Sequence, residues 1–263
     1  MQRRQFLSAS LASSALALTQ RGSAQATAGA REYYLVRRYN LQMGPQPALT
    51  EKYFADALIP ALTRLGLGPV GVLRLEFGPE TPAYYVLVPG SSADRLALLD
   101  LHLAGDTEFM KAAEPFWSAP ATAPPFQRVE STLLVAFEGW PKLVTPAAQD
   151  LKGKRIFQLR TYESPSFAAH VRKVEMFNSG EFEIFKNAGC RPMFFGDTLI
   201  GSRMPSLTYM LCFAGSQELD AGWNAFRNDP AWKKLSGSPR YNYEAIVSNI
   251  TNLTLSPLDC SQI

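Results

Sequence analysis

A repeat with an offset of 123 positions is the feature that most constrains what this chain of 263 residues can fold into. The aligned pairs lie between positions 37 and 111 of the first copy and need no gap. Several of them are Gly or Pro at places where the chain must turn. The identical pairs are Arg37–Arg160, Tyr39–Tyr162, Phe54–Phe177, Gly66–Gly189, Pro69–Pro192, Gly78–Gly201, Pro82–Pro205, Asp106–Asp229 and Lys111–Lys234. The chain is therefore expected to contain two copies of one structural unit.

The second copy predicts the order strand, helix, strand, strand, helix, strand. Residues 155–162 alternate as a strand does, and Ser164-Pro165 is typical of a helix start. The later elements are expected at 192–200, 207–213, 216–228 and 243–255. The first copy repeats the order, with elements expected at 32–40, 49–65, 70–88, 94–117 and 128–137.

This order is that of the split βαβ, ferredoxin-like unit. A four-stranded sheet with helices on one face leaves its other face bare, so we expect the two sheets to cover each other. The predicted fold class is α+β, with two tandem ferredoxin-like (βαββαβ) units forming an intrachain pseudo-dimeric α/β barrel. The expected domains are a signal peptide at 1–26, a first unit at 31–140, a linker at 141–153, a second unit at 154–256 and a tail at 257–263.

The N-terminus predicts export by the twin-arginine pathway. Arg3 and Arg4 are followed by x-Phe-Leu, a short apolar stretch and Ala24-Gln25-Ala26, which is typical of a cleavage site. The apolar stretch is too short and too weak for a membrane anchor, and no run in the chain reaches the ~18 residues of a spanning helix. We therefore expect a periplasmic or secreted protein without a membrane span.

Charge and cysteine content exclude several classes of partner. The formal net charge of +3 is carried by the three arginines of segment 1–26, so the remainder is neutral. A neutral chain without basic runs argues against nucleic acid as a partner. Three cysteines make neither a disulfide scaffold nor a zinc pattern, and a Cys190–Cys212 bridge is left open.

The second half resembles the NIPSNAP family. The residues that carry the resemblance are Phe157 to Tyr162, His170 to Glu181, Phe194 to Gly201 and Asp229 to Trp232. The first half shares it only through its similarity to the second. The resemblance implies the dimeric α/β-barrel fold and no agreed catalytic residues.

An Arg-x-Tyr pair on the first strand of each half supplies the main candidate ligand site, made of Arg37, Tyr39, Arg160 and Tyr162. Strand side chains alternate between faces, so we expect Phe157 and Leu159 to face the helices and the Arg-x-Tyr side chains to face the barrel interior. An interior guanidinium would bind a carboxylate or another anion. The alternative is that these residues only hold the two sheets together.

His170 completes the candidate site. It has no second ligand beside it on its helix, so the sequence predicts no metal site. His170 is interpreted as a lone general base or an axial haem ligand, or else as an ordinary helix histidine. The sequence specifies no cofactor.

Three functions are compatible with these residues. The first is an exported NIPSNAP-like barrel that binds a small organic ligand, anionic in one version of the hypothesis, with any turnover left open. The second is a cofactor-independent or haem-using oxygenase or isomerase of the α/β-barrel type, which rests on fold analogy. The third is a non-catalytic interaction module, and further homo-oligomerisation stays open for all three.

Overall fold

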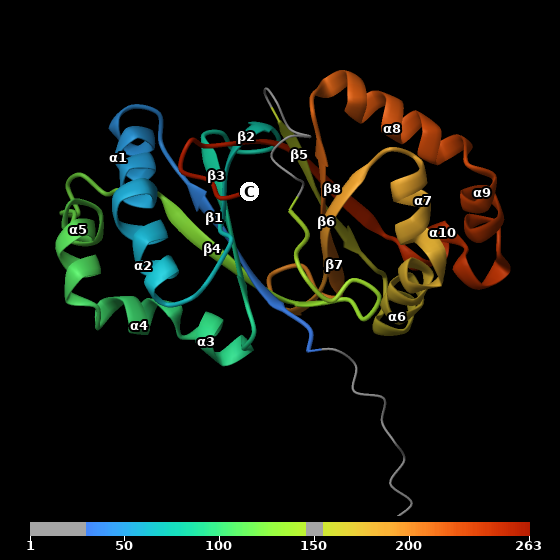
Figure 1. Cartoon of the computed structure of the whole chain (residues 1–263), viewed down its shortest axis with the longest axis horizontal. Helices are drawn as coiled ribbons and strands as arrows, with labels where there is room; N and C mark the ends of the chain where they lie inside the picture. The colour runs from blue at the N-terminus through green and yellow to red at the C-terminus, as the bar shows by residue number, and fades with distance from the viewer. Residues whose placement is uncertain (1–29, 146–154) are drawn as a thin grey trace, which may run out of the picture.

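The strands close into one antiparallel barrel in the computed structural model, which describes residues 30–145 and 155–263. The order around the barrel is β1-β3-β2-β8-β5-β7-β6-β4. Figure 1 shows this barrel at the centre of the molecule with helices on two opposite sides. The strands are β1 (Tyr33–Asn40), β2 (Gly71–Phe77), β3 (Ala83–Gly90), β4 (Arg128–Ala136), β5 (Ile156–Glu163), β6 (Arg191–Ile200), β7 (Ser206–Phe213) and β8 (Asn249–Pro257).

The helices fall into two groups, one for each half of the chain. The first group is α1 (Pro45–Tyr53), π-helix η1 (Phe54–Leu58), α2 (Ile59–Arg64), α3 (Ala93–Ala97), α4 (Leu99–Ala104) and α5 (Thr107–Trp117). The second is α6 (Phe167–Met176), π-helix η3 (Phe177–Glu181), α7 (Phe182–Asn187), α8 (Ser216–Asn228), α9 (Pro230–Ser236), 3-10 helix η4 (Pro239–Tyr241) and α10 (Tyr243–Ile246). No helix in the described part of the chain is long and apolar enough to cross a membrane.

The two halves are copies of one unit, as the repeat predicts. Each contributes four neighbouring strands in the ferredoxin-like order, and the seams of the barrel are β2–β8 and β4–β6. Arg37 pairs with Val86 and Arg160 with Tyr209, so the register of the central strand pair repeats with the same offset as the sequence. The π-helices also repeat at this offset. The predicted fold class is confirmed.

Three expected boundaries differ clearly from the structure. The helix expected to start at Ser164-Pro165 begins at Phe167, because Ser166 is the residue that caps it: its Oγ accepts a hydrogen bond from the Ala169 amide. The last strand begins at Asn249 and not at 243, because Tyr243–Ile246 form the short helix α10. Ile246 is buried in the core beneath the helices, so its apolar run packs as a helix and not as a strand. The first helix begins at Pro45, four residues before the expected start, because proline is favoured at the first helical position.

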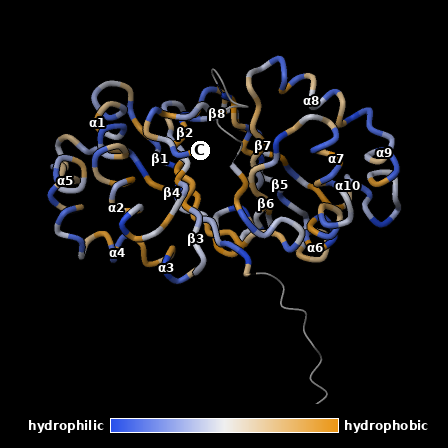
Figure 2. The backbone as a smooth tube through the Cα atoms, viewed as in Figure 1, coloured by the Kyte–Doolittle hydropathy of each residue, from blue (hydrophilic) through white to orange (hydrophobic). Residues whose placement is uncertain are grey.

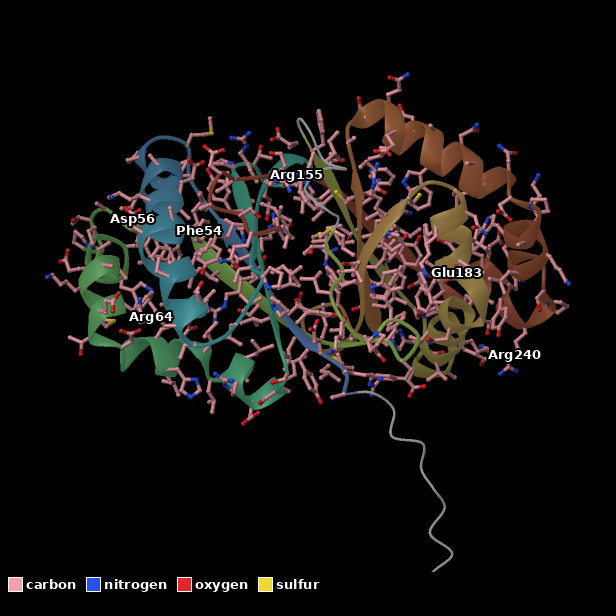
Figure 3. The ribbon with its side chains drawn as sticks, in the orientation of Figure 1. Phe54, Asp56, Arg64, Arg155, Glu183 and Arg240 are labelled. Carbon is pink, nitrogen blue, oxygen red and sulfur yellow. The ribbon has the colours of Figure 1, made fainter. Side chains whose placement is uncertain are left out.

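Both faces of the sheets are buried. One core lies between the first sheet and its helices, a second lies between the second sheet and its helices, and a third fills the barrel. Figure 2 shows the resulting concentration of hydrophobic residues along the central strands. Phe54 of η1 lies in the first core, whereas Asp56 and Arg240 are exposed (Figure 3).

Candidate functional site

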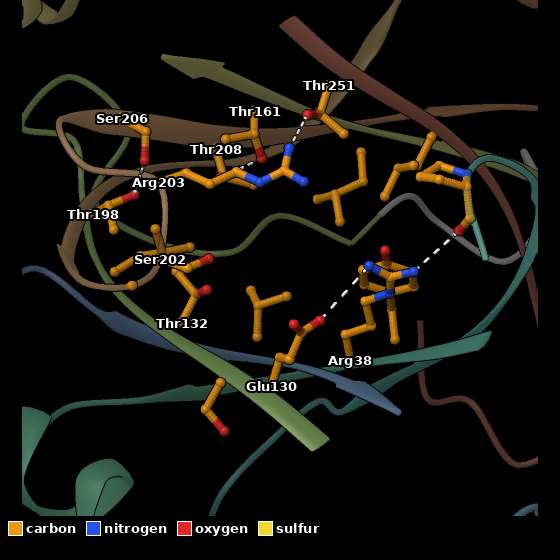
Figure 4. Close-up of a pocket in the computed structure, with 18 residues that line it drawn as sticks. Arg38, Glu130, Thr132, Thr161, Thr198, Ser202, Arg203, Ser206, Thr208 and Thr251 are labelled. Atoms are coloured by element: carbon orange, nitrogen blue, oxygen red, sulfur yellow. Dashed lines mark hydrogen bonds and ion pairs between the residues drawn. The ribbon is translucent and has the colours of Figure 1, made fainter. Parts of the chain in front are cut away.

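A pocket of about 370 Å³ opens at the end of the barrel where β1 and β5 finish. We call it the barrel-mouth pocket. Both halves contribute to it, and Figure 4 shows the side chains converging from opposite walls. Its lining is Val36, Arg38, Pro79, Tyr85, Glu130, Ser131, Thr132, Leu134, Leu159, Thr161, Thr198, Gly201, Ser202, Arg203, Ser206, Thr208, Thr251 and Leu253.

Strand alternation explains how the lining is layered. Residues two apart on a strand share a face, so Leu159 and Thr161 of β5 both point into the barrel. The leucine lies deeper, within the core of the barrel, and the threonine lies nearer the mouth. Leu253 and Thr251 of β8 repeat this arrangement. The pocket therefore has an apolar floor and a hydroxyl-lined wall.

Two hydroxyl pairs on this wall keep hydrogen-bonding capacity for a ligand. Thr161 Oγ1 and Thr208 Oγ1 lie 2.8 Å apart, and Thr198 Oγ1 and Ser206 Oγ lie 3.0 Å apart. Each hydroxyl carries one proton and two acceptor lone pairs. One proton per pair is used within the pair, so each pair can still donate one hydrogen bond into the cavity.

Arg38 on β1 is held by protein groups. Its Nη2 donates to Glu80 Oε2 at 2.8 Å and to the Pro79 carbonyl at 3.0 Å. Its Nη1 lies 3.6 Å from Glu130 Oε2, and its side chain is only 15% exposed. Arg38 therefore fixes the hairpin between β2 and β3 to the barrel wall, and most of its donor fork is occupied.

Arg203 is the more available cation. It lies on the hairpin between β6 and β7 and reaches toward Thr251, to which its Nη1 donates (Figure 4). Its nearest acidic oxygen is Glu163 Oε1 at 3.6 Å, and its side chain is 47% exposed. Within the described part of the chain, its Nε and Nη2 have no hydrogen-bond partner. These two donors can bind an oxygen atom of a ligand.

Residues 258–263 pack against the start of β2 at the other end of the barrel, with hydrogen bonds from Leu258 to Val72 and from Gln262 to Val70. Ile263 is 4% exposed and belongs to the core inside the barrel, where it contacts Gly71 at the start of β2. Gln262 Oε1 accepts a hydrogen bond from the Val70 amide at 2.7 Å. A side chain on Gly71 would collide with the end of the Ile263 side chain, which would then have to shift. The segment expected as a tail therefore packs onto the barrel at the end away from the pocket.

The expected orientation of the Arg-x-Tyr pairs is wrong. Tyr39 and Tyr162 lie in the two cores beneath the helices, whereas Phe157 and Leu159 lie inside the barrel. Both faces of these strands are buried, so an apolar side chain does not indicate which face is the interior. Arg37 and Arg160 therefore lie on the helix sides of separate sheets, and neither lines the barrel-mouth pocket.

Arg37 forms an ion pair within the first unit. Its Nη1 and Nη2 donate to the two carboxylate oxygens of Asp100 on α4, at 2.7 and 3.0 Å. A bidentate pair of this kind occupies the fork that a ligand anion would need. Arg37 therefore ties α4 to the sheet.

Arg160 lies among aromatic rings, and within the described residues it forms no direct ion pair, although its charge acts on the buried Glu181 carboxylate. Its guanidinium carbon is 4.4 Å from the ring centre of Trp223 and 5.4 Å from that of Tyr162. The Tyr162 hydroxyl lies 2.9 Å from that of Tyr209. Burial raises the pKa of Tyr209 well above its usual range, so that hydroxyl stays neutral. The role of Arg160 and Tyr162 in ligand binding stays a prediction.

A buried ion pair lies deeper in the same layer. Lys173 Nζ donates to Glu181 Oε2 at 2.8 Å, and both residues are almost fully buried. The ammonium also lies 4.3 Å from the ring centre of Phe177. Burial raises the pKa of Glu181, although Lys173 acts in the opposite direction. The second unit therefore contains a buried ion pair that the sequence did not predict. The repeat gave no signal for it, because Lys173 aligns with Thr50 and Glu181 aligns with Leu58 in the first copy.

His170 on α6 is 7% exposed and is paired with Asp197 on β6. Its Nε2 lies 2.7 Å from Asp197 Oδ1, and its Nδ1 is buried without a hydrogen-bond partner in the described residues. Asp197 is the orienting acid that sequence analysis did not identify. Residues 30–145 and 155–263 contain no His, Cys, Asp and Glu grouping that could hold a metal ion.

Cys190 and Cys212 do not form the disulfide bond that the sequence left open. Both are free, and they lie on opposite faces of the sheet, one beneath the helices and one inside the barrel. Burial raises the pKa of Cys190 to about 12 and that of Cys212 to about 11. Neither thiol is therefore a ready nucleophile.

Residues 157–262 match the NIPSNAP family model. This match confirms the resemblance for the second unit. No curated protein matches the chain.

Solved structures share the whole barrel at low sequence identity. A "putative monooxygenase" from Fusobacterium nucleatum is 8% identical, with 88% of this chain and 94% of that chain covered and a TM-score of 0.57. A "putative monooxygenase" from Lactobacillus acidophilus is 12% identical, with 86% and 94% covered and a TM-score of 0.55. An anthrone oxidase-like protein is 11% identical, with 88% and 93% covered and a TM-score of 0.50. Similarity at this level establishes the fold alone.

Proposed function

We propose that this protein binds a small organic molecule with a carbonyl or carboxylate oxygen in the barrel-mouth pocket. The observation that carries the proposal is the position of Arg203. It lines a cavity with hydroxyl groups on its wall, and its Nε and Nη2 have no hydrogen-bond partner among the described residues. The volume of about 370 Å³ lies within the range of small-molecule sites, ~300–1,000 Å³.

The lining favours a ligand of low charge. Arg38 and Arg203 contribute two positive charges and Glu130 one negative charge, and Arg38 is already paired. Arg203 and the threonine hydroxyls suit an oxygen acceptor, while the leucine floor suits an apolar ring or chain. A neutral carbonyl compound or a monoanion satisfies both surfaces.

Titration calorimetry with two probes tests this proposal. The probes are 4-hydroxybenzoate and its methyl ester, which share a ring and differ in charge. We expect both to bind the wild-type protein in the millimolar range or tighter, and Arg203→Met to weaken binding about ten- to hundred-fold, as for loss of a charged hydrogen bond.

Arg227→Met is the matched control, because Arg227 is exposed on α8, outside the pocket. It should leave the affinity of both probes unchanged. Absence of binding at millimolar concentration, or equal affinity of the Arg203→Met and wild-type proteins, would contradict the proposal.

The second candidate function is a cofactor-independent oxygenase or isomerase centred on His170. One observation favours it: Asp197 accepts a hydrogen bond from Nε2, which leaves the unpartnered Nδ1 as a proton acceptor. The printed names of three structural relatives, "putative monooxygenase" for two and "anthrone oxidase-like protein" for the third, all refer to reactions with molecular oxygen.

Oxygen consumption with anthrone as the probe tests the second candidate. His170→Gln should abolish uptake, and Asp197→Asn should reduce it while leaving the fold intact. His102→Gln on α4 is the control, since His102 is exposed in the other half. No uptake by the wild-type protein, or normal uptake by His170→Gln, would exclude this function for the histidine.

We also propose export through the twin-arginine pathway. The support is Arg3-Arg4 with the following apolar stretch and Ala24-Gln25-Ala26, which lie outside the described residues. Replacing both arginines with lysine keeps the charge and should leave an unprocessed protein in the cytoplasm. A processed double variant in the periplasm would show that another route is used.

A further inference from the structure

The equivalent arginines of the two units have different partners. Arg37 and Arg160 correspond under the repeat, and each lies within reach of the hydroxyl of the tyrosine two residues later on its strand. In the first unit, both Nη atoms of Arg37 donate to Asp100 of α4. The counterpart of Asp100 at the 123-residue offset is Trp223 of α8. The second unit therefore carries an indole ring where the first unit carries a carboxylate.

The indole ring covers one face of the Arg160 guanidinium. The guanidinium carbon lies 4.4 Å from the ring centre of Trp223. The indole Nε1 donates to Gln158 Oε1 at 2.6 Å, and Gln158 is buried on the same strand as Arg160, so the ring is held in place. Stacking uses the flat face of a guanidinium, whereas its N–H bonds point outward in the plane. The donor fork that Asp100 occupies in the first unit is therefore left without a carboxylate in the described part of the second.

The layer around Arg160 contains more positive than negative charge. Lys173 and Glu181 form a closed pair, with Nζ and Oε2 2.8 Å apart and side chains 0% and 2% exposed. Arg160 acts on the Glu181 carboxylate without direct contact. When all three groups are ionised, one positive charge is unbalanced. Because a buried charge is costly unless it is paired, an anion at Arg160 would stabilise this layer.

Tyrosine hydroxyls surround the same place. The Tyr162 hydroxyl lies 2.9 Å from that of Tyr209, and the ring centre of Tyr243 on α10 lies 6.4 Å from that of Tyr162. Burial raises the pKa of Tyr243, so its hydroxyl stays protonated and can donate a hydrogen bond. Arg160, Trp223 and Tyr243 are each only half-buried, so a small ion can reach them from solvent.

From these contacts we propose that the second unit binds a small monocarboxylate at Arg160, on the helix side of its sheet. The two carboxylate oxygens would match the guanidinium fork as those of Asp100 match Arg37. A monoanion balances the single excess charge, whereas a dianion would leave the layer negative. This site is separate from the barrel-mouth pocket, because neither Arg160 nor Trp223 lines that pocket.

Titration calorimetry with benzoate tests the site. The full-length Arg203→Met protein serves as the parent, because it lacks the available cation of the barrel-mouth pocket, so that binding at Arg160 is measured alone. We expect benzoate to bind this parent in the millimolar range or tighter, and Arg160→Met to weaken binding about ten- to hundred-fold. Methyl benzoate, which lacks the charge, and sulfate, which is a dianion, should both bind the parent more weakly than benzoate.

Two substitutions of Trp223 form a matched pair. Trp223→Asp introduces the acid of the first unit, which should pair with Arg160 as Asp100 pairs with Arg37 and lower benzoate affinity at least ten-fold. Trp223→Phe keeps an aromatic face without an acid, and its affinity should stay within about five-fold of the parent. Circular dichroism and the urea midpoint identify the variants that are folded, and either Arg160→Met or the Trp223 pair suffices for the test.

Several results would overturn the proposal. These are absence of benzoate binding at millimolar concentration, full affinity in Arg160→Met, and equal affinity of Trp223→Asp and Trp223→Phe. Binding of methyl benzoate or sulfate as tight as that of benzoate would overturn the assignment to a monocarboxylate. Each of these results leaves the barrel-mouth pocket untouched, since the parent protein already lacks Arg203.

Discussion

Breaking the buried pair between Lys173 and Glu181 should destabilise the protein strongly, whereas removing both charges should not. Lys173→Met leaves a buried carboxylate without its hydrogen-bonded ammonium, with Arg160 as the remaining nearby cation, and Glu181→Leu leaves a buried ammonium without its anion. The two side chains are 0% and 2% exposed, so water cannot replace the missing partner. The nearby ring of Phe177 compensates an ammonium only in part.

The size of the effect follows from burial. Removing one partner of a buried ion pair costs about 3–5 kcal/mol, because the remaining charge is uncompensated. A domain has only ~5–15 kcal/mol of stability, so each single variant should lose a large part of it. The Lys173→Met/Glu181→Leu variant keeps similar side-chain volumes, and we expect its stability to equal or exceed that of the wild-type protein.

Urea denaturation followed by circular dichroism measures the free energy of unfolding of all four proteins. The double-mutant cycle should give a coupling of several kcal/mol at an unchanged m-value. Lys52→Met is the control, since Lys52 forms an exposed pair with Asp56, and its cost should stay below about 0.5 kcal/mol. Single variants that lose under about 1 kcal/mol, or costs that simply add, would refute this account.

Three further predictions concern stability. Asp100→Asn should lower the free energy of unfolding, measured by urea denaturation, by about 1 kcal/mol. The loss is moderate because Arg37 is buried but Asp100 is 60% exposed, so water screens the pair in part. An unchanged free energy of unfolding would show that the ion pair does not hold α4 on the sheet. Arg240 and the neighbouring Tyr241 lower the pKa of Glu175 from 4.5 to about 2. The stabilising contribution of Glu175 is therefore complete above pH 4.5 and is lost as the pH falls through about 2, so Glu175→Gln should flatten the acid side of a plot of urea midpoint against pH. Ile263→Asp should lower the melting temperature in calorimetry by placing a charge inside the barrel, and an unchanged melting temperature would contradict the burial of Ile263.

The fold could be predicted because the repeat is a global signal. Phe54 and Phe177 align, and both begin a π-helix in the same place beneath equivalent sheets. Turns at Gly78 and Gly201 align as well, which fixes the lengths of the strands on either side. A pattern that recurs across a hundred residues is insensitive to errors at single boundaries, such as the start of β8.

The candidate site could be predicted only in part. Alternation along a strand divides side chains into two sets, but in a barrel covered by helices neither set faces water. Arg160 was therefore assigned to the wrong face. A usable signal for the pocket was present, since inward positions change from Leu159 to Thr161 and from Leu253 to Thr251 toward one end. Arg203 could not be assigned to the pocket, because it lies on a hairpin, where side chains do not alternate regularly between two faces.

Covalent fusion of the two halves removes a restriction that two-fold symmetry imposes on a homodimer. In a symmetric pair of identical chains, every residue at the mouth would occur twice. Here Arg38 corresponds to Thr161, and Glu80 corresponds to Arg203. One wall can thus hold a closed ion pair while the opposite wall offers an available cation. After duplication each half could diverge independently, so the mouth of the barrel can distinguish the two ends of a molecule that a symmetric opening would bind equally well either way round.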